Sequence, residues 1–281
     1  MRFNGFPEIK ESVIADHLPA TFMLAPLAMA LVEQGVPVKI VYLGHRDGTA
    51  LMVEKDSGVL SVRDLRGKKV AIPNRFSNQN LLLRKALADQ GMTVDDIELI
   101  EMPPPDMPAA LYSKAVDGIT SGEPFMAQTE MDGYGRVLYQ AKDIWPEFIS
   151  CVLVVSQKTI DEHPEWVQQL VTGIAKSGMW LEGGGGDRMD HRMKAAQAVA
   201  TGYYNQDPRL LSFVLSKPPD RVTYSNLRLA RAEFERINDM AVEAGVLTRR
   251  MAFEEYADPR FSEQTTGATA YPGVGRPVPG G

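Results

Sequence analysis

An apolar strand that stops at a proline and passes through a polar turn directly into a helix is the feature that most constrains this chain. Val70–Ile72 form the apolar run, Pro73 ends it, and a Phe-Ser-Asn-Gln turn at 76–79 leads into Leu81–Leu83. The first N–H groups of a helix lack internal acceptors and lie at the positive end of the helix dipole. The turn therefore favours an anionic or polar ligand, and the alternative is an ordinary connection in which Ser77 caps the helix.

Strand-like and helix-like segments alternate before and after this unit, and helical segments dominate the second half of the chain. Apolar spacing predicts strands at 36–43, 50–53, 69–72, 97–101, 117–120, 136–139 and 151–155. It predicts helices at 8–14, 22–31, 79–90, 107–114, 124–132, 161–181, 190–204, 207–216 and 224–245. A polar loop at 44–49 follows an interior strand, where open α/β sheets place their ligands. We therefore expect an α/β fold with a helical C-terminal part.

Charge and hydropathy exclude two kinds of partner. The 30 Lys and Arg residues are scattered among 36 Asp and Glu residues, and no basic surface stripe emerges that could bind nucleic acid. No segment approaches the roughly 18 consecutive apolar residues of a membrane span, so we expect no direct membrane insertion. Cys151 is the single cysteine and lies in the apolar run 149–155, which favours a buried structural thiol.

The sequence contains none of the common motifs of hydrolases, kinases or zinc sites. The four histidines, His17, His45, His163 and His191, are far apart and have no metal-ligand spacing, and His45 alone falls in a loop expected at a cleft. We therefore expect no catalytic residues, no metal and no cofactor, which argues against an enzyme.

Five short blocks, in the same order and with similar spacing, resemble the solute-binding proteins of bacterial ABC importers. The similarity is to the nitrate/sulfonate/bicarbonate (taurine, NMT1/THI5-like) group, is closest to its nitrate and bicarbonate branch, and covers about residues 12–180. The blocks are Phe76-Ser77 with Asn80-Leu81-Leu82-Leu83-Arg84, Pro103-Pro104-Pro105-Asp106-Met107, Val116-Asp117-Gly118, Gly122-Glu123-Pro124-Phe125 and Lys142-Asp143-Ile144-Trp145.

The resemblance implies a two-lobed, periplasmic-binding-protein-like (type II) fold. We expect residues 1–53 and 157–264 to form lobe I and residues 54–156 to form lobe II, with hinges near 53–55 and 156–158. Gly, Pro and Thr dominate from Thr265 onward, so we expect residues 265–281 to be a disordered tail.

The resemblance also bears on the start of the chain and its location. Members of the family carry an export signal, a strand and a helix ahead of the segment that is similar to Phe3–Lys10. We therefore expect either that the start of the chain is misassigned or that the gene product is truncated. A truncated chain would lack a strand of lobe I, and its sheet would expose apolar surface near residues 36–43. The family implies a periplasmic or cell-surface location, although no export signal is visible in this chain.

Five residues are candidates for ligand binding. Thr49 and Ser77 offer hydroxyls, Gln79 an amide and Lys142 a positive charge. The resemblance implies a ligand-facing Lys142, whereas Gln79 replaces a histidine of the branch and Thr49 replaces a glutamine. Glu123 either holds a cation such as Lys142, binds a cationic part of the ligand, or caps the helix that begins near Pro124.

The leading hypothesis is the solute-binding component of an ABC importer. It would capture a small oxyanion or organic acid of the nitrate, bicarbonate or sulfonate class between two lobes, and its partners would be the ABC permease and its ATPase. One alternative is a binding protein for a thiamine-related pyrimidine precursor, or a synthase-like enzyme of that fold. Another is a cytoplasmic ligand-sensing domain of the same fold.

Overall fold

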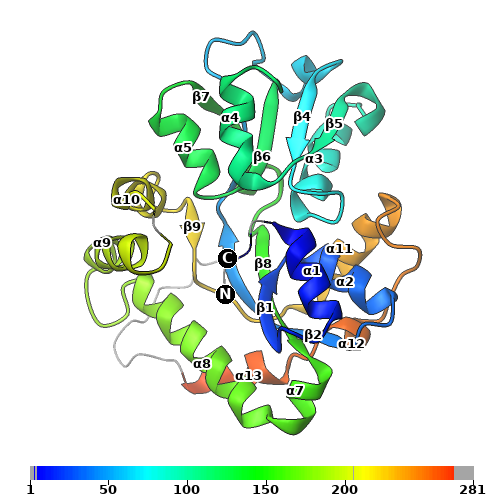
Figure 1. Cartoon of the computed structure of the whole chain (residues 1–281), viewed down its shortest axis with the longest axis vertical. Coiled ribbons are helices and arrows are strands. Elements are labelled where there is room, and N and C mark those ends of the chain that lie inside the picture. Colours follow the sequence, from blue (N-terminus) through cyan, green and yellow to red (C-terminus); the bar gives the residue numbers. More distant parts are fainter. Residues whose placement is uncertain (1–2, 4, 205, 269–281) are drawn as a thin grey trace, which may run out of the picture.

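The computed structural model describes residue 3, residues 5–204 and residues 206–268, and it contains two β-sheets in separate halves of the molecule (Figure 1). The four-stranded sheet has the order β1 (Ala20–Met23), β8 (Ile149–Ser156), β2 (Val38–Asp47) and β9 (Val222–Thr223), and every pair is antiparallel. The five-stranded sheet has the order β5 (Glu98–Glu101), β4 (Lys69–Ile72), β6 (Gly118–Gly122), β3 (Thr49–Glu54) and β7 (Gly135–Gln140). The pairs of β4 are parallel, whereas β3 is antiparallel to β6 and β7.

Helices surround both sheets, and the prediction of an α/β fold is confirmed. In sequence order they are α1 (Phe6–Ile14), α2 (Ala25–Glu33), α3 (Asn78–Ala88), α4 (Met107–Tyr112), α5 (Phe125–Met131), α6 (Ala141–Ile144), α7 (Gln157–Glu162), α8 (Pro164–Leu181), α9 (Arg188–Val199), α10 (Pro208–Ser216), α11 (Arg231–Glu243), α12 (Phe253–Tyr256) and α13 (Arg260–Ala268). The helix expected over 161–181 is divided at His163, because Pro164 takes the first position of α8. No described helix is long and apolar enough to cross a membrane.

Two strands lie in the opposite half from the one expected. The predicted lobe boundaries put the strand at 50–53 in lobe I and the strand at 151–155 in lobe II, but β3 belongs to the five-stranded sheet and β8 to the four-stranded sheet. The chain therefore passes between the sheets at Gly48 and again between β7 and β8, through α6, rather than near 53–55 and 156–158. Short apolar strands carry no local mark of the sheet they join, so the sequence could not show this.

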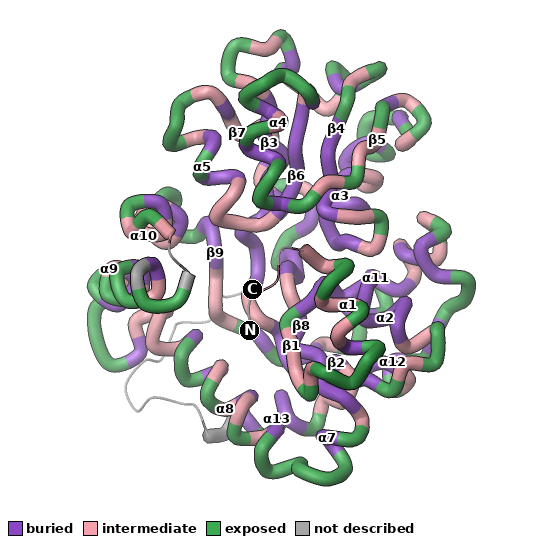
Figure 2. The backbone as a smooth tube through the Cα atoms, viewed as in Figure 1, coloured by how far each residue is buried: buried purple, intermediate pink, exposed green. Residues whose placement is uncertain are grey.

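The apolar residues of β3 divide between two cores because successive side chains of a strand point to opposite faces. Leu51 and Val53 face the large core that includes α3 and the four-stranded sheet. Ala50 and Met52 face a smaller core under α4 and α5. Figure 2 shows the buried stretches that run through the centres of both halves. Because both faces of this strand are buried, its sequence is a continuous apolar run.

Several local expectations were wrong. Residues 44–47 continue β2 instead of forming a loop, and the helix expected from 224 begins at Arg231. Most of the apolar surface expected to be exposed at 36–43 is covered, since Val38 and 40–43 are buried and Pro37 is exposed. The backbones of Leu227 and Asp258 hydrogen-bond to β2 there, at 3.1 and 2.9 Å. Of the tail predicted at 265–281, residues 265–268 belong to α13 and residues 269–281 lie outside the described part.

The single-residue connection at Gly48 gives a test of the fold. Gly48 has φ of +70°, and an added Cβ would lie 2.8 Å from Val222 Cγ2. Gly67 has nearly the same φ, +71°, with no atom within 4 Å of its added Cβ. We expect Gly67→Ala to cost about 1–2 kcal/mol of unfolding free energy and Gly48→Ala about 1–3 kcal/mol more, measured by urea denaturation. Equal losses would show that the contact with β9 relaxes freely.

Candidate functional site

The site predicted from the sequence lies where the two sheets meet. Backbone hydrogen bonds fix this junction: Gly48 donates to the Arg221 carbonyl at 2.7 Å, and Glu123 donates to the Gly48 carbonyl at 2.9 Å. Asp47 donates to the Phe148 carbonyl at 2.8 Å. One short turn thereby brings together the ends of β2 and β6, the start of β8 and the segment before β9.

Ser77 caps α3, as the alternative interpretation of the turn predicts. Its Oγ accepts the Asn80 N–H at 3.1 Å and donates to the Asn74 carbonyl at 2.6 Å. The residue is fully buried. Because its hydroxyl already serves as donor and acceptor, the role of Ser77 in the described structure is to begin the helix and orient the two residues that follow.

Asn78 and Gln79 occupy the first turn of α3 and keep unpaired acceptors. Asn78 Nδ2 donates to the carbonyls of Ile149 and Ser150, at 2.7 and 3.2 Å, which assigns the remaining amide atom as oxygen. Gln79 Nε2 donates to Thr49 Oγ1 at 3.1 Å. Both residues are buried, and neither Asn78 Oδ1 nor Gln79 Oε1 has a hydrogen-bond partner within the described residues. Gln79 and Thr49, two of the predicted residues, are therefore in direct contact.

Two further polar side chains face the same side of the five-stranded sheet. Thr120 on β6 and Tyr139 on β7 both lie opposite Leu51 of β3, so all three side chains share one face. Thr120 Oγ1 and the Tyr139 hydroxyl are buried and have no partner in the part of the chain that is described. Burial raises the pKa of Tyr139, which keeps its hydroxyl protonated. Neither residue is predicted from the sequence, because a single polar residue in an apolar strand has no distinctive spacing.

His45 and Asp47, near the end of β2, also carry unpaired buried atoms. Burial lowers the pKa of His45 and raises that of Asp47, although the nearby Lys142 charge opposes the second shift. Thr223 Oγ1 donates to Asp47 Oδ2 at 3.4 Å, and Asp47 Oδ1 has no partner among the described residues. His45 lies opposite Cys151 in the strand register. Burial raises the pKa of that thiol to about 11, so it is a thiol rather than a thiolate near neutral pH.

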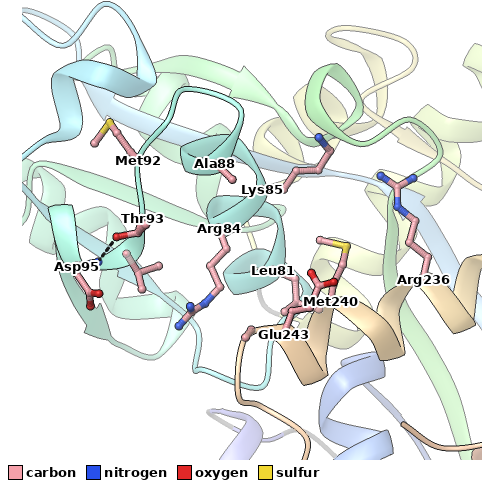
Figure 3. A pocket seen from close by; sticks show the side chains of 12 residues that line it. Leu81, Arg84, Lys85, Ala88, Met92, Thr93, Asp95, Arg236, Met240 and Glu243 are labelled. Carbon is pink, nitrogen blue, oxygen red and sulfur yellow. Dashed lines mark hydrogen bonds between the residues drawn. The ribbon is translucent and has the colours of Figure 1, made fainter. Parts of the chain in front are cut away.

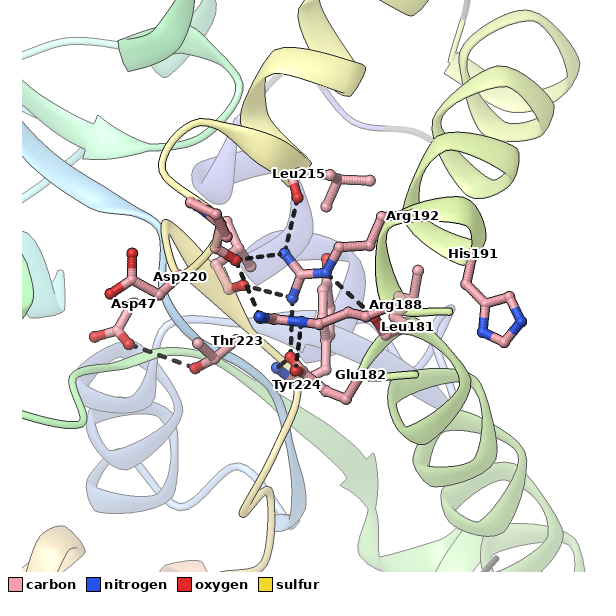
Figure 4. Close-up of polar contacts among 12 residues, drawn as sticks. Asp47, Leu181, Glu182, Arg188, His191, Arg192, Leu215, Asp220, Thr223 and Tyr224 are labelled. Carbon is pink, nitrogen blue, oxygen red and sulfur yellow. Dashed lines mark hydrogen bonds and ion pairs between the residues drawn. The ribbon is translucent and has the colours of Figure 1, made fainter. Parts of the chain in front are cut away.

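Lys142 is half-buried and lies beside the junction, but its charge is already paired. Its Nζ lies 2.5 Å from Asp220 Oδ2, and the hydrogen bond lowers the pKa of Asp220. Figure 4 shows Asp220 beside Asp47. A solute that reaches Lys142 must therefore compete with, or bridge to, two carboxylates.

Glu123 holds a cation, although not Lys142. Arg221 is buried; its Nη1 donates to Glu123 Oε1 at 2.7 Å and its Nη2 to Glu130 Oε2 at 2.6 Å. Glu123 Oε2 also accepts the Ala127 N–H at 2.7 Å in the first turn of α5, which agrees with the capping alternative. Burial raises the pKa of Glu123, and Arg221 opposes the shift. Arg221 is not predicted from the sequence, because nothing around it indicates a partner about a hundred residues earlier.

A second buried arginine anchors the segment that carries Asp220 and Arg221 (Figure 4). Arg192 is fully buried and donates to the carbonyls of Leu215, Pro219 and Val222, at 3.0, 3.1 and 3.0 Å. Its Nη2 also donates to Glu182 Oε1 at 2.9 Å. With the Leu181 carbonyl, which accepts from Nε at 3.2 Å, five acceptors surround the guanidinium; they compensate for the cost of burying its charge and fix this segment against the junction.

A cavity of about 430 Å³ lies between the two halves, next to Glu123. The five-stranded half contributes Pro104, Pro105 and Phe125, and the other half contributes mostly side chains from α1, α9 and α10. Glu123 is the predicted site residue that lines it, and most of its other walls are apolar. The arrangement is a polar junction beside an apolar cleft, with no cluster of three metal-ligating side chains in the described residues.

Two α/β halves joined around such a junction define a two-lobed α/β fold, and comparison with known proteins gives the family. The model of the NMT1-like family matches residues 1–200, so the chain belongs to this family. The nitrate import ATP-binding protein NrtC of Synechocystis sp. is 30% identical over 168 residues, 54% of this chain and 25% of that protein. The taurine-binding periplasmic protein of Escherichia coli is 29% identical over 170 residues, 56% of this chain and 51% of that protein. The chain thus spans about a quarter to half of these relatives.

Solved structures share the fold at lower identity. The periplasmic nitrate-binding protein NrtA from Synechocystis has a TM-score of 0.83 and 14% identity, over 97% of this chain and 80% of that chain. The alkanesulfonate-binding protein SsuA from Xanthomonas axonopodis, bound to MOPS, has a TM-score of 0.76 and 18% identity, over 90% of this chain and 85% of that chain. The desulfurization enzyme DSZB has a TM-score of 0.62 and 17% identity, over 90% of this chain and 87% of that chain. The predicted periplasmic-binding-protein-like fold is confirmed.

The buried Arg221 pair can be tested by removing one partner. Arg221→Met leaves Glu123 buried without a counter-charge, and we expect a loss of about 3–5 kcal/mol in unfolding free energy. Adding Glu123→Gln should recover part of that loss, because the uncompensated charge is gone. Arg209→Met, which removes an exposed ion pair with Asp207, is the control and should change little. Urea denaturation measures all four proteins, and no recovery in the double variant would contradict the pairing.

The environment of His45 predicts a pH dependence of stability. The pKa of His45 is lowered in the folded state, whereas a histidine in the unfolded chain has a pKa of about 6.5. The unfolded chain therefore binds the proton first, and stability is lost as the pH falls below about 6.5. We expect His45→Gln to flatten this loss between about pH 7 and pH 5, measured by urea denaturation, and the exposed His17→Gln not to. Parallel curves for His45→Gln and the unchanged protein would refute the assignment.

Proposed function

We propose that this protein is the solute-binding component of an ABC importer and that it captures a small organic acid at the junction between its halves. The single observation that carries the choice of solute is the set of unpaired, buried acceptors at the start of α3 and the end of β2. Membership of the NMT1-like family, and relatives named as nitrate-import and taurine-binding proteins, support the class of function.

The polarity of the junction favours a solute that carries hydrogen-bond donors. Asn78 Oδ1, Gln79 Oε1 and Asp47 Oδ1 can each accept a hydrogen bond, whereas nitrate offers no donor. The α3 N-terminus and Lys142 favour an anionic group. A zwitterion with an ammonium and a sulfonate or carboxylate matches both requirements. A buried acceptor without a donor costs about 1–3 kcal/mol. A solute that donates to these acceptors removes this cost and therefore binds more tightly than an oxyanion that has no donor.

The cavity next to Glu123 supports an organic rather than an inorganic solute. Pro104, Pro105 and Phe125 offer it no polar side-chain atoms, and the Glu123 carboxylate is engaged by Arg221. An apolar wall stabilises methylene or ring groups through burial and offers nothing to nitrate or bicarbonate. This moves the preferred solute from the nitrate and bicarbonate branch toward the sulfonate side of the group.

The two lobes of the proposed binding protein follow the sheets. We place lobe II at residues 49–140 and assign the remainder, apart from the connection through α6, to lobe I. Closure around a solute would then bend the chain at Gly48 and within 141–148. Permease and ATPase partners and a periplasmic location are part of the proposal, and they rest on the family relatives.

An enzyme is the second candidate, since DSZB shares the fold and His45 lies opposite Cys151. A nucleophilic cysteine beside histidine needs a thiolate, which a lowered thiol pKa and a charged imidazole favour. Here burial moves both groups the other way, toward neutral thiol and neutral imidazole. The neutral pair supports a binding protein. The alternatives of a pyrimidine-precursor protein or a cytoplasmic sensor have no specific residue in their favour.

Two solutes that differ in one group test the proposal. Taurine and ethanesulfonate share the sulfonate and the two-carbon chain, and taurine adds an ammonium. We expect taurine to bind at least about tenfold more tightly by calorimetry, because charged donors meet the unpaired acceptors. Asp47→Asn should reduce the preference, and nitrate should bind more weakly than either. Tighter binding of nitrate, or equal affinities for both sulfonates, would exclude the proposed solute class.

Lys142 is tested in the same titration. Lys142→Met should weaken both sulfonates by about tenfold or more if the lysine reaches the anionic group, with taurine still preferred. Lys158→Met removes an exposed lysine that lies 3.8 Å from Asp16, and it is the matched control. Unchanged affinities in Lys142→Met would show that this lysine serves only its pair with Asp220.

A further inference from the structure

A groove on another face of the molecule has the composition of a ligand site. It lies between α11 on one side and α3 with the short 3₁₀ helix Val94–Asp96 on the other, and its volume is about 510 Å³ (Figure 3). We call it the α3–α11 groove. None of the five predicted site residues lines it. Its walls come from both halves, since α3 covers the five-stranded sheet and α11 contacts α2 and α12 of the other half.

Apolar side chains form half of the lining of the α3–α11 groove, and charged or polar side chains form the rest. Leu81 and Met92 are buried, and Met240 is half-buried on α11. Ala88 and Ala244 complete the wall with small side chains that leave the groove open. Two methionines and a leucine around such a space can adapt to an apolar chain of variable shape.

Two arginines in the groove have no carboxylate partner among the described residues. Arg84 is half-buried, and its Nε donates to Asn80 Oδ1 at 3.2 Å, which leaves both terminal nitrogens of the guanidinium available. Burial lowers the pKa of Arg84 while the Asp95 charge raises it. The guanidinium of Arg236 lies 5.0 Å from the centre of the Trp145 ring. Lys85 differs from them, because Asp89 holds its Nζ at 2.7 Å.

The acidic residues limit the charge that the groove accepts. Asp95 and Glu243 also line it, and both are exposed. Two carboxylates near two guanidinium groups repel a dianion more strongly than they repel a single negative charge at Arg84, where the Asp95 charge also acts. Phosphate esters and dicarboxylates therefore match this groove less well than a monoanion does.

We propose that the α3–α11 groove is a second binding site, which takes an organic monoanion with a short apolar chain. Its carboxylate or sulfonate pairs with the two terminal nitrogens of the Arg84 guanidinium, and its apolar chain lies against Leu81, Met92 and Met240. A bidentate pair between a guanidinium and an acid group in a partly desolvated place is among the stronger polar contacts in proteins. This proposal stands apart from the solute site at the junction, because no residue is shared.

The two methionines provide a local measurement. In protein labelled with ¹³C at methionine methyl groups, hexanoate should shift the resonances of Met92 and Met240, which are assigned through Met92→Leu and Met240→Leu. Met126, buried in the core beneath α5, should not move. Hexanol lacks the charge and acetate lacks the chain, so we expect each to bind at least about tenfold more weakly than hexanoate. Ala88→Phe separates this binding from closure around a solute at the junction, because it fills the groove and leaves the junction residues unchanged.

Variants separate this site from a nonspecific apolar surface. Arg84→Met should weaken hexanoate by about tenfold or more, whereas Lys85→Met, which removes an already paired charge on the same helix, should have a much smaller effect. Ala88→Phe fills the groove at an exposed position and should abolish the shifts, which keeps the test valid if Arg84→Met does not fold. Unmoved Met92 and Met240 resonances, equal shifts with hexanol, or normal binding in Ala88→Phe would each overturn the proposal.

Discussion

The one-residue connection at Gly48 is the constraint on which the rest of this structure depends. β2 ends at Asp47 in one sheet and β3 begins at Thr49 in the other, so a single residue with positive φ must redirect the chain. The same residue donates to the Arg221 carbonyl and accepts from Glu123. A side chain at this position would meet Val222, which makes glycine a steric requirement as well as a conformational one.

Because Gly48 leaves so little chain between the sheets, polar groups from both halves converge there. Arg221 reaches from the segment before β9 to Glu123 and Glu130, and Arg192 holds that segment in place from α9. Asn78 of α3 reaches the start of β8. Each contact joins residues that are at least 20 positions apart, so the binding surface is a product of the assembled sheets rather than of any one loop.

These contacts change the roles that the sequence suggests for Lys142 and Ser77. The sequence suggests Lys142 as a free cation for an oxyanion, but in the structure it pairs with Asp220, and its charge also acts on Asp47. The sequence suggests Ser77 as a hydrogen-bond donor to the ligand, but its hydroxyl forms hydrogen bonds within the cap of α3. Within the described residues, three acceptors and the hydroxyls of Thr120 and Tyr139 remain unpaired there, and this mixture of acceptors and donors favours a zwitterionic organic solute over a simple anion.

The sequence by itself determined the α/β class, most element positions and the strand–turn–helix unit at 69–88, because these depend on local apolar spacing, capping and proline. It also determined the family, since five ordered blocks are specific. Tertiary structure alone decided that β3 and β8 exchange halves, that Arg221 pairs with Glu123, and which polar atoms at the junction stay unpaired. Apolar strands fit either sheet equally well, and a buried charge finds its partner only when distant segments pack together. For that reason local patterns located the region of the site, and its chemistry required the fold.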